Sequence, residues 1–188
     1  MQIDKNIILA SSSPRRSEIL LKSGIDFEIL KVNFKEEVNT TFSVEQVPLK
    51  LALDKMDQCR APKQNELIIT CDTVVAFRNN VLGKPNSDKE AFETLSRLSS
   101  NTHHVISGVC LATKKTRLSF NSITEVTFDT IPEKAIRNYI ETKSPFDKAG
   151  SYGIQDDFGL KYVKGIIGCY YNVMGLPINT LIKILANF

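Results

Sequence analysis

The sequence has few of the features that define disulfide-bonded, zinc-binding or membrane-spanning proteins. Its four cysteines lie far apart, no Cys-x-x-Cys pair is present, and no group of cysteines and histidines has the spacing of a zinc site. No signal peptide and no apolar run long enough to span a bilayer can be recognised. We therefore expect a reduced, soluble, cytoplasmic protein.

Several signatures of catalysis and of nucleic-acid binding are also missing. The chain contains no Walker-type Gly-x-x-x-x-Gly-Lys, no dinucleotide fingerprint and no Ser/His/Asp arrangement, so covalent nucleophilic catalysis has little support. The 24 Lys and Arg residues against 21 Asp and Glu residues give a net charge of +3, and no run of like charge stands out. We therefore expect neither nucleic acid nor a membrane as a partner.

The chain does contain an alternation of strand and helix patterns. With 188 residues, 42% of them hydrophobic, it can bury a core as one domain or as two tightly packed lobes. Strand-like runs occur over residues 6–10, 27–32, 67–77, 103–112, 118–128, 160–163 and 168–174. Helical spacing and capping signals predict helices over residues 14–23, 44–58, 87–98 and 132–142 and from residue 178. Crossovers combined with central hairpins predict an α/β fold with a mixed central β-sheet flanked by helices.

The most informative segment covers residues 7–20, where an apolar stretch breaks into three serines, a proline and two arginines. It predicts a buried strand, a tight turn and the start of a helix, with Pro14 at the first helical position and Ser13 as the capping residue. Backbone N–H groups, serine hydroxyls and the guanidinium groups of Arg15 and Arg16 would meet there, and such a place attracts phosphates. An ordinary capped helix with two solvated arginines explains these residues equally well.

Acidic residues at two positions are candidates for chemistry. Asp72, followed by Thr73, interrupts the apolar strand 67–77, and a carboxylate there is costly to bury unless it is paired, hydrogen-bonded or bound to a cation. Ligands also sit at strand ends in α/β sheets. Glu36 and Glu37, in a polar loop, could add oxygen ligands for Mg²⁺. The alternatives are an aspartate that bonds local amides and a solvated acidic surface.

Two lysines and a glycine-containing loop are further candidates. Lys55 and Lys84 are each expected to be exposed, and Lys84 is the better candidate because a glycine and a proline fix the backbone on either side. The segment 148–155 contains two glycines, which let a backbone approach a ligand, and Gln155, which can donate to and accept from a base edge. A purely structural loop explains the segment equally well.

The remaining conspicuous side chains are predicted to be structural. His103 and His104 are adjacent, so on a strand they point to opposite faces and cannot form one site. Tyr170, Tyr171 and Phe188 are predicted to be packing residues.

Taken together, these segments resemble the Maf family of nucleoside triphosphate pyrophosphatases, in the expected order from about residue 7 to residue 188. The specific motifs are Leu9-Ala-Ser-x-Ser-Pro-Arg-Arg16 and Lys148-Ala-Gly-x-Tyr-Gly-Ile-Gln155, with Asp72-Thr73 and Gly83-Lys-Pro85 between them. Weaker matches are Thr102-His103, Ser122-x-Thr-x-Val126 and Gly175-Leu-Pro177. The resemblance implies a Maf/ITPase-like fold, two lobes around a cleft, with residues 1–188 as one catalytic domain.

The resemblance also implies an activity, which is hydrolysis between the α and β phosphates of a nucleotide. Asp72 matches the family's catalytic base, and a divalent cation, Mg²⁺ or Mn²⁺, is implied at Asp72 and Glu36, although Glu37 could align instead. The implied catalytic set is Asp72, Glu36, Lys55 and Lys84. The implied substrate-binding set is Ser11, Ser13, Arg15, Arg16, Thr73 and Gln155.

Three of these positions, Arg15, Thr73 and Gln155, track substrate choice in the family, and this combination resembles the branch that prefers dTTP and UTP. A homodimer is a further expectation, since the family often forms dimers. The alternatives are a pyrophosphatase for damaged, inosine-type purine nucleotides and a nucleotide-binding regulator of cell division.

Overall fold

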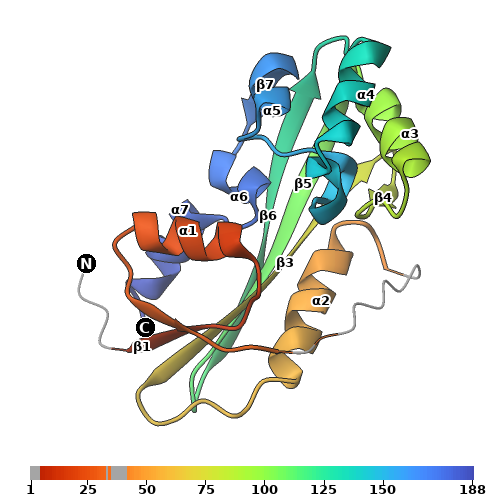
Figure 1. Cartoon of the computed structure of the whole chain (residues 1–188). Coiled ribbons are helices and arrows are strands. Elements are labelled where there is room, and N and C mark those ends of the chain that lie inside the picture. The colour runs from red at the N-terminus through yellow and green to blue at the C-terminus, as the bar shows by residue number, and fades with distance from the viewer. Residues whose placement is uncertain (1–4, 33, 35–41) are drawn as a thin grey trace. The chain divides into compact units, whose positions relative to one another are not determined.

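The structure, a computed structural model, describes residues 5–32, 34 and 42–188 (Figure 1). The strands are β1 (Asn6–Leu9), β2 (Phe27–Ile29), β3 (Glu66–Phe77), β4 (Asn80–Leu82), β5 (Thr102–Ala112), β6 (Arg117–Phe128) and β7 (Val163–Ile167). The helices are α1 (Pro14–Lys22), α2 (Gln46–Asp57), α3 (Asp88–Leu98), α4 (Glu133–Glu141), α5 (Asp157–Tyr162), α6 (Tyr170–Met174) and α7 (Ile178–Leu185), with 3₁₀ turns η1 (Ser144–Asp147) and η2 (Ala149–Ser151).

The strands in the described part of the chain form one mixed sheet, in the order β2-β1-β3-β5-β6-β7 with β4 paired to β3. The strand β1 runs parallel to β2 and β3, whereas β4 is antiparallel to β3 and β7 is antiparallel to β6. The predicted α/β fold with a mixed sheet flanked by helices is therefore confirmed.

The chain divides into two compact units. The first consists of Met1–Thr73, Ser107–Ser122 and Gly175–Phe188, and the second of Val74–Ile106 and Ile123–Met174. The division falls inside β3, β5 and β6, so each of these strands contributes residues to both units. That residues 1–188 act as one catalytic domain stays a prediction.

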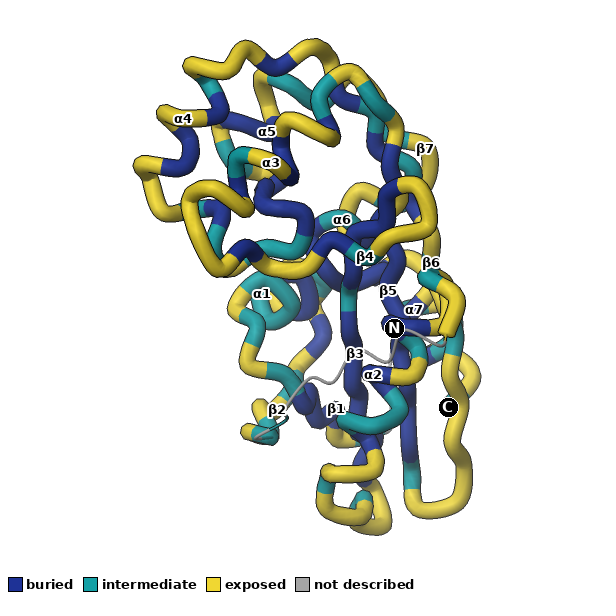
Figure 2. The backbone as a smooth tube through the Cα atoms, turned by 90° about the vertical axis from the view of Figure 1, so that its right-hand side faces the viewer, coloured by how far each residue is buried: buried dark blue, intermediate teal, exposed yellow. Residues whose placement is uncertain are grey.

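In the first unit, helices cover both faces of the sheet (Figure 1). The helix α2 packs on one face, where Ala52 and Met56 join a buried cluster with Ile8, Ile68 and Cys110. The helices α1 and α7 lie on the other face (Figure 1). Figure 2 shows that β3, between these layers, is buried almost throughout. Such a strand reads as a continuous apolar run because both of its faces are covered.

In the second unit, α3 packs against α4, and the buried ring of Phe128 contacts the buried rings of Tyr152 and Phe158. The capping signal at Ser87 is confirmed, because its hydroxyl accepts the N–H of Glu90 at 3.1 Å, but Glu90 itself accepts from Asn86. The phenol of Tyr152 lies 2.8 Å from His103 Nε2, and both side chains are buried with Phe128. The structural assignment of His103 is therefore confirmed.

Several local predictions are wrong. Residues 160–163 were expected to form a strand but mostly belong to α5, and residues 168–174 contain α6. The strand β7 lies between these two helices in sequence. Tyr170 and Tyr171 were expected to be packing residues; their rings pack edge to face with centroids 5.6 Å apart, but each residue is 40% exposed. Among the described residues, no helix is both long enough and apolar enough to cross a membrane.

Acidification is expected to destabilise the protein through His103. Burial lowers the pKa of His103 from 6.5 to about 3. Between these values the unfolded chain binds a proton at His103 that the folded protein does not, so the free energy of unfolding falls as the pH drops, by up to about 1.4 kcal/mol per pH unit. The variant His103→Gln cannot titrate there, so its unfolding free energy, measured in urea between pH 4 and 6.5, should depend less steeply on pH.

The matched control is His104→Gln on the same strand, because the His104 side chain is 49% exposed. This control is expected to keep most of the wild-type slope. Equal slopes for wild type and His103→Gln would contradict a buried, neutral His103.

Candidate functional site

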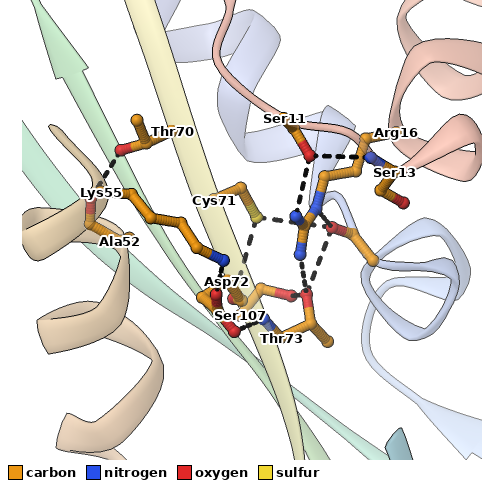
Figure 3. Close-up of polar contacts among 11 residues, drawn as sticks. Ser11, Ser13, Arg16, Ala52, Lys55, Thr70, Cys71, Asp72, Thr73 and Ser107 are labelled. Atoms are coloured by element: carbon orange, nitrogen blue, oxygen red, sulfur yellow. Dashed lines mark hydrogen bonds and ion pairs between the residues drawn. The ribbon is translucent and has the colours of Figure 1, made fainter. Parts of the chain in front are cut away.

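The turn between β1 and α1 is organised by the hydroxyl of Ser11. This hydroxyl accepts hydrogen bonds from the Ser13 backbone N–H at 3.2 Å and from Arg16 Nη1 at 3.1 Å (Figure 3). Pro14 occupies the first turn of α1, as predicted. Ser13 is the N-cap residue, but its side chain makes no capping bond, so its predicted capping role is wrong. The Ser11 hydroxyl and the Arg16 side chain are instead bonded to each other at the start of the helix.

Arg16 joins three segments that are far apart in sequence. Besides Ser11, its guanidinium group donates from Nε to the Gly175 carbonyl at 2.8 Å and from Nη2 to Thr73 Oγ1 at 3.2 Å (Figure 3). Three of its five N–H groups are therefore bonded to described residues, and two remain. An oriented guanidinium group with spare donors is suited to bind a phosphate.

Asp72 lies within β3, and its side chain is only 7% exposed. Its Oδ1 atom accepts the Thr73 backbone N–H at 2.9 Å, and its Oδ2 atom forms an ion pair with Lys55 Nζ (Figure 3). A charged partner and an amide together offset the desolvation of the carboxylate. Asp72 therefore has two partners at once: a local backbone amide, as in the structural alternative, and the ammonium group of Lys55.

Lys55 comes from α2 and is not exposed, contrary to expectation, since 13% of its side chain is accessible. Besides the apolar cluster, two close approaches hold α2 against the sheet. The Thr70 hydroxyl donates to the Ala52 carbonyl at 2.7 Å, and Gly108 in β5 meets the backbone of α2 near Leu49. Because α2 comes this close, Lys55 reaches Asp72.

Three polar groups that the sequence did not single out as site residues complete this arrangement. The buried Ser107 hydroxyl lies 2.8 Å from Thr73 Oγ1, and the Gly175 carbonyl accepts from Arg16, from Thr73 at 3.2 Å and from the Cys71 thiol at 3.4 Å. Burial raises the pKa of Cys71. The only signals in the sequence were a serine inside an apolar strand and the Gly-Leu-Pro turn.

For three other predicted site residues, the structure gives the unit or helix and the exposure. Lys84 and Gln155 are exposed residues of the second unit, and Arg15 is half-buried on α1. Glu36 and the neighbouring Glu37 lie outside the described residues. The structure thus brings together Ser11, Arg16, Lys55, Asp72 and Thr73, with Ser13 bonded through its backbone.

Within the second unit, the Gly-Lys-Pro segment and the segment 148–155 are in contact. The Gly150 N–H donates to the Gly83 carbonyl at 3.1 Å. Gly150 adopts a φ of +69°, and a Cβ there would lie 2.8 Å from Val75, so the turn needs glycine. Two motifs that are distant in sequence therefore form one structural element.

The residue after Gln155 is held firmly. Asp156 accepts hydrogen bonds from the hydroxyls of Tyr139 at 2.6 Å and Ser144 at 2.7 Å, and Lys148 Nζ lies 3.6 Å away. Burial alone would raise the pKa of Asp156, but these hydrogen bonds and the Lys148 charge outweigh it, and the pKa lies below its ordinary value. The carboxylate therefore fixes the backbone beside Gln155.

The single described carboxylate of this site, Asp72, fits one kind of metal site. Among the described residues, no three His, Cys, Asp or Glu side chains gather as metal ligands. Mg²⁺ in nucleotide sites needs only one or two carboxylates, because waters and substrate phosphates supply its other ligands. The residues present therefore fit a metal that arrives with a phosphate, and they do not form a complete protein cage.

The fold and this site define an α/β protein whose first unit pairs a buried carboxylate with an ammonium group and bonds a guanidinium group to the next residue, Thr73. The family model "Maf-like protein" matches residues 6–188, and the chain belongs to the Maf family. A dTTP/UTP pyrophosphatase of Phocaeicola vulgatus is 45% identical over 177 residues, covering 93% of this chain and 92% of that protein. A dTTP/UTP pyrophosphatase of Bacillus cereus is 41% identical over 184 residues, covering 98% and 90%.

Substitution of Gly108 is expected to destabilise the first unit. A Cβ at Gly108 would lie 2.3 Å from the Leu49 backbone nitrogen, so Gly108→Ala must push α2 away from the sheet. Overpacking of this kind costs about 1–3 kcal/mol. The free energy of unfolding in urea measures this loss.

The matched control is Gly165→Ala in β7, where no atom lies within 4 Å of the added Cβ. It is expected to unfold within about 0.5 kcal/mol of wild type. A Gly108→Ala variant as stable as Gly165→Ala would show that α2 does not need this close approach.

Proposed function

We propose that this protein is a nucleoside triphosphate pyrophosphatase that hydrolyses dTTP and UTP to the nucleoside monophosphate and pyrophosphate. The names of its curated relatives support this activity. The observation that carries the proposal is the buried Asp72 carboxylate between Lys55 and the Arg16–Thr73 pair, with two N–H groups of Arg16 left over among the described residues. Charges of both signs are needed where a water attacks a polyphosphate.

In the proposed reaction, Asp72 acts as general base. Its carboxylate takes a proton from a water, the water oxygen forms a bond to the α-phosphorus, and the bond from that phosphorus to the oxygen of the β-phosphate breaks. The leaving pyrophosphate carries the electron pair. Arg16 and Lys55 are placed to neutralise the charge that develops on the phosphate oxygens. The Thr73 N–H holds Oδ1 of Asp72 in a fixed orientation.

A divalent cation belongs to the proposal. Asp72 would hold Mg²⁺ or Mn²⁺, together with Glu36, which lies outside the described residues. The bound cation would neutralise phosphate oxygens and lower the pKa of a water. Asp72 already pairs with Lys55. When the cation and the nucleotide bind, Lys55 must either share the carboxylate with the cation or turn to the phosphates.

Loss of the Asp72 charge is expected to stop the reaction. Asp72→Asn preserves the size of the side chain but removes its basicity, and loss of a general base costs about 100-fold to 10,000-fold in rate. Release of pyrophosphate from dTTP with Mg²⁺ or Mn²⁺ measures the effect, and the circular dichroism spectrum verifies the fold.

Asp157→Asn is the control, because the Asp157 side chain is 91% exposed. It should retain wild-type turnover. A chelator is expected to stop the wild-type enzyme, and added Mg²⁺ or Mn²⁺ to restore it. Full activity of Asp72→Asn would refute the general-base role, and full activity in the chelator would refute the metal requirement.

Base preference is proposed to depend on Gln155, whose amide can both donate to and accept from a pyrimidine edge. A site built on such bonds rejects a base that leaves them unpaired. Gln155→Ala is therefore expected to lower the preference for dTTP and UTP more than the overall turnover. A panel of canonical, inosine and modified pyrimidine triphosphates measures this preference.

The same panel separates the alternatives. Unchanged substrate ratios in Gln155→Ala would count against the base-reading role. A wild-type enzyme that prefers inosine triphosphate would point to a purine house-cleaning pyrophosphatase. Tight nucleotide binding without any release of pyrophosphate would indicate a nucleotide sensor and refute the proposed activity.

A further inference from the structure

The hydroxyl of Thr73 has no hydrogen-bonding capacity left for a substrate. Its oxygen lies 2.8 Å from Ser107 Oγ, 3.2 Å from the Gly175 carbonyl oxygen and 3.2 Å from Arg16 Nη2 (Figure 3). A threonine hydroxyl has one proton and two lone pairs. Three partners use all three.

The direction of each of these bonds follows from the chemistry of the partners. A carbonyl oxygen only accepts and a guanidinium group only donates, so Thr73 donates to Gly175 and accepts from Arg16. The second lone pair then accepts the proton of Ser107, whose side chain is fully buried. One arrangement of protons satisfies every contact.

The Gly175 carbonyl supports the same guanidinium group. It accepts Arg16 Nε at 2.8 Å and the Thr73 hydroxyl at 3.2 Å, so the carbonyl and the hydroxyl hold two nitrogens of the guanidinium group. Gly175 has a φ of +117°, a conformation that side-chain-bearing residues rarely adopt. Ser11 holds the third nitrogen at 3.1 Å. The guanidinium orientation is therefore fixed before any ligand binds.

We infer that Thr73 and Ser107 are positioning residues that hold Arg16 for the polyphosphate, and that Thr73 does not itself contact the base. This rests on the proposed nucleotide-binding function of the site. The resemblance to the Maf family implies that position 73 tracks substrate choice. Because all hydrogen-bonding positions of the Thr73 hydroxyl are used, residue 73 would influence substrate choice indirectly. It would do so by setting the position of the Arg16 guanidinium group and of the triphosphate bound to it.

A double-mutant cycle tests the inference. The affinity for an analogue of dTTP with a methylene bridge between the α and β phosphorus atoms is measured by calorimetry for wild type, Arg16→Ala, Thr73→Val and the double variant. Each single substitution is expected to weaken binding at least about ten-fold, because a bond to a charged group is lost or misplaced. The double variant should bind within about two-fold of Arg16→Ala, since Thr73 acts through Arg16.

Further variants separate positioning from a general loss of structure. Thr73→Ser keeps the hydroxyl and is expected to recover most of the affinity that Thr73→Val loses, and Ser107→Ala should weaken binding in the same direction. Thr94→Val removes a hydroxyl from a buried threonine of α3 and should bind as wild type. If Thr73→Val fails to fold, as judged by thermal unfolding, Ser107→Ala takes its place in the cycle.

The outcomes distinguish this inference from the proposed function. The positioning role would be overturned if the affinity losses of the two single variants added up in the double variant. It would also be overturned if Thr73→Val changed the ratio of dTTP to dCTP affinity in the Arg16→Ala background. Wild-type protein that binds the analogue but releases no pyrophosphate from dTTP would refute the proposed activity alone. The cycle is still measurable in that case.

Discussion

The charge of Asp72, buried in a strand that is otherwise apolar, is the constraint on which the candidate site depends. A carboxylate withdrawn from water needs a cation and hydrogen-bond donors, and here Lys55 and the Thr73 amide supply them. Lys55 reaches the carboxylate only because α2 lies against the sheet, where Gly108 leaves room for its backbone. Packing of the core and electrostatics of the site are therefore set by the same contacts.

A second consequence follows from how Arg16 is held. Its partners come from the turn between β1 and α1, from the middle of β3 and from Gly175, three residues before α7. No single local motif contains this arrangement, so it forms only when the first unit has folded. Preorganised charge of this kind needs no reorganisation when a phosphate binds, which favours binding and catalysis alike.

The sequence predicted features whose signals are local. The strand, turn and helix of residues 7–20 follow from an apolar run, a proline and the change from strand-like to helical spacing of apolar residues. Asp72 was identified because it interrupts an apolar strand. Residues 168–174 were misassigned because a helix of five residues, three of them Tyr or Val, is too short to reveal a helical period. Lys55 was expected in solvent, since its partner lies 17 positions away in sequence.

Ser107 and Gly175 could not be identified as site residues by pattern alone. A buried serine in a strand and a glycine in a turn are common, and their roles appear only in the distances to Thr73 and Arg16. The family resemblance provided what the pattern lacked, namely the association of distant motifs with one nucleotide site. The positions of Lys84 and Gln155 in that site stay predictions.

The burial of Cys71 has a practical consequence for thiol chemistry. Its sulfur is inaccessible, it donates to the Gly175 carbonyl, and its raised pKa keeps it protonated at neutral pH. Alkylating reagents attack the thiolate, so the native protein protects this cysteine although it is the direct neighbour of Asp72. The rate at which Cys71 is labelled would therefore measure how often β3 opens to solvent next to Asp72.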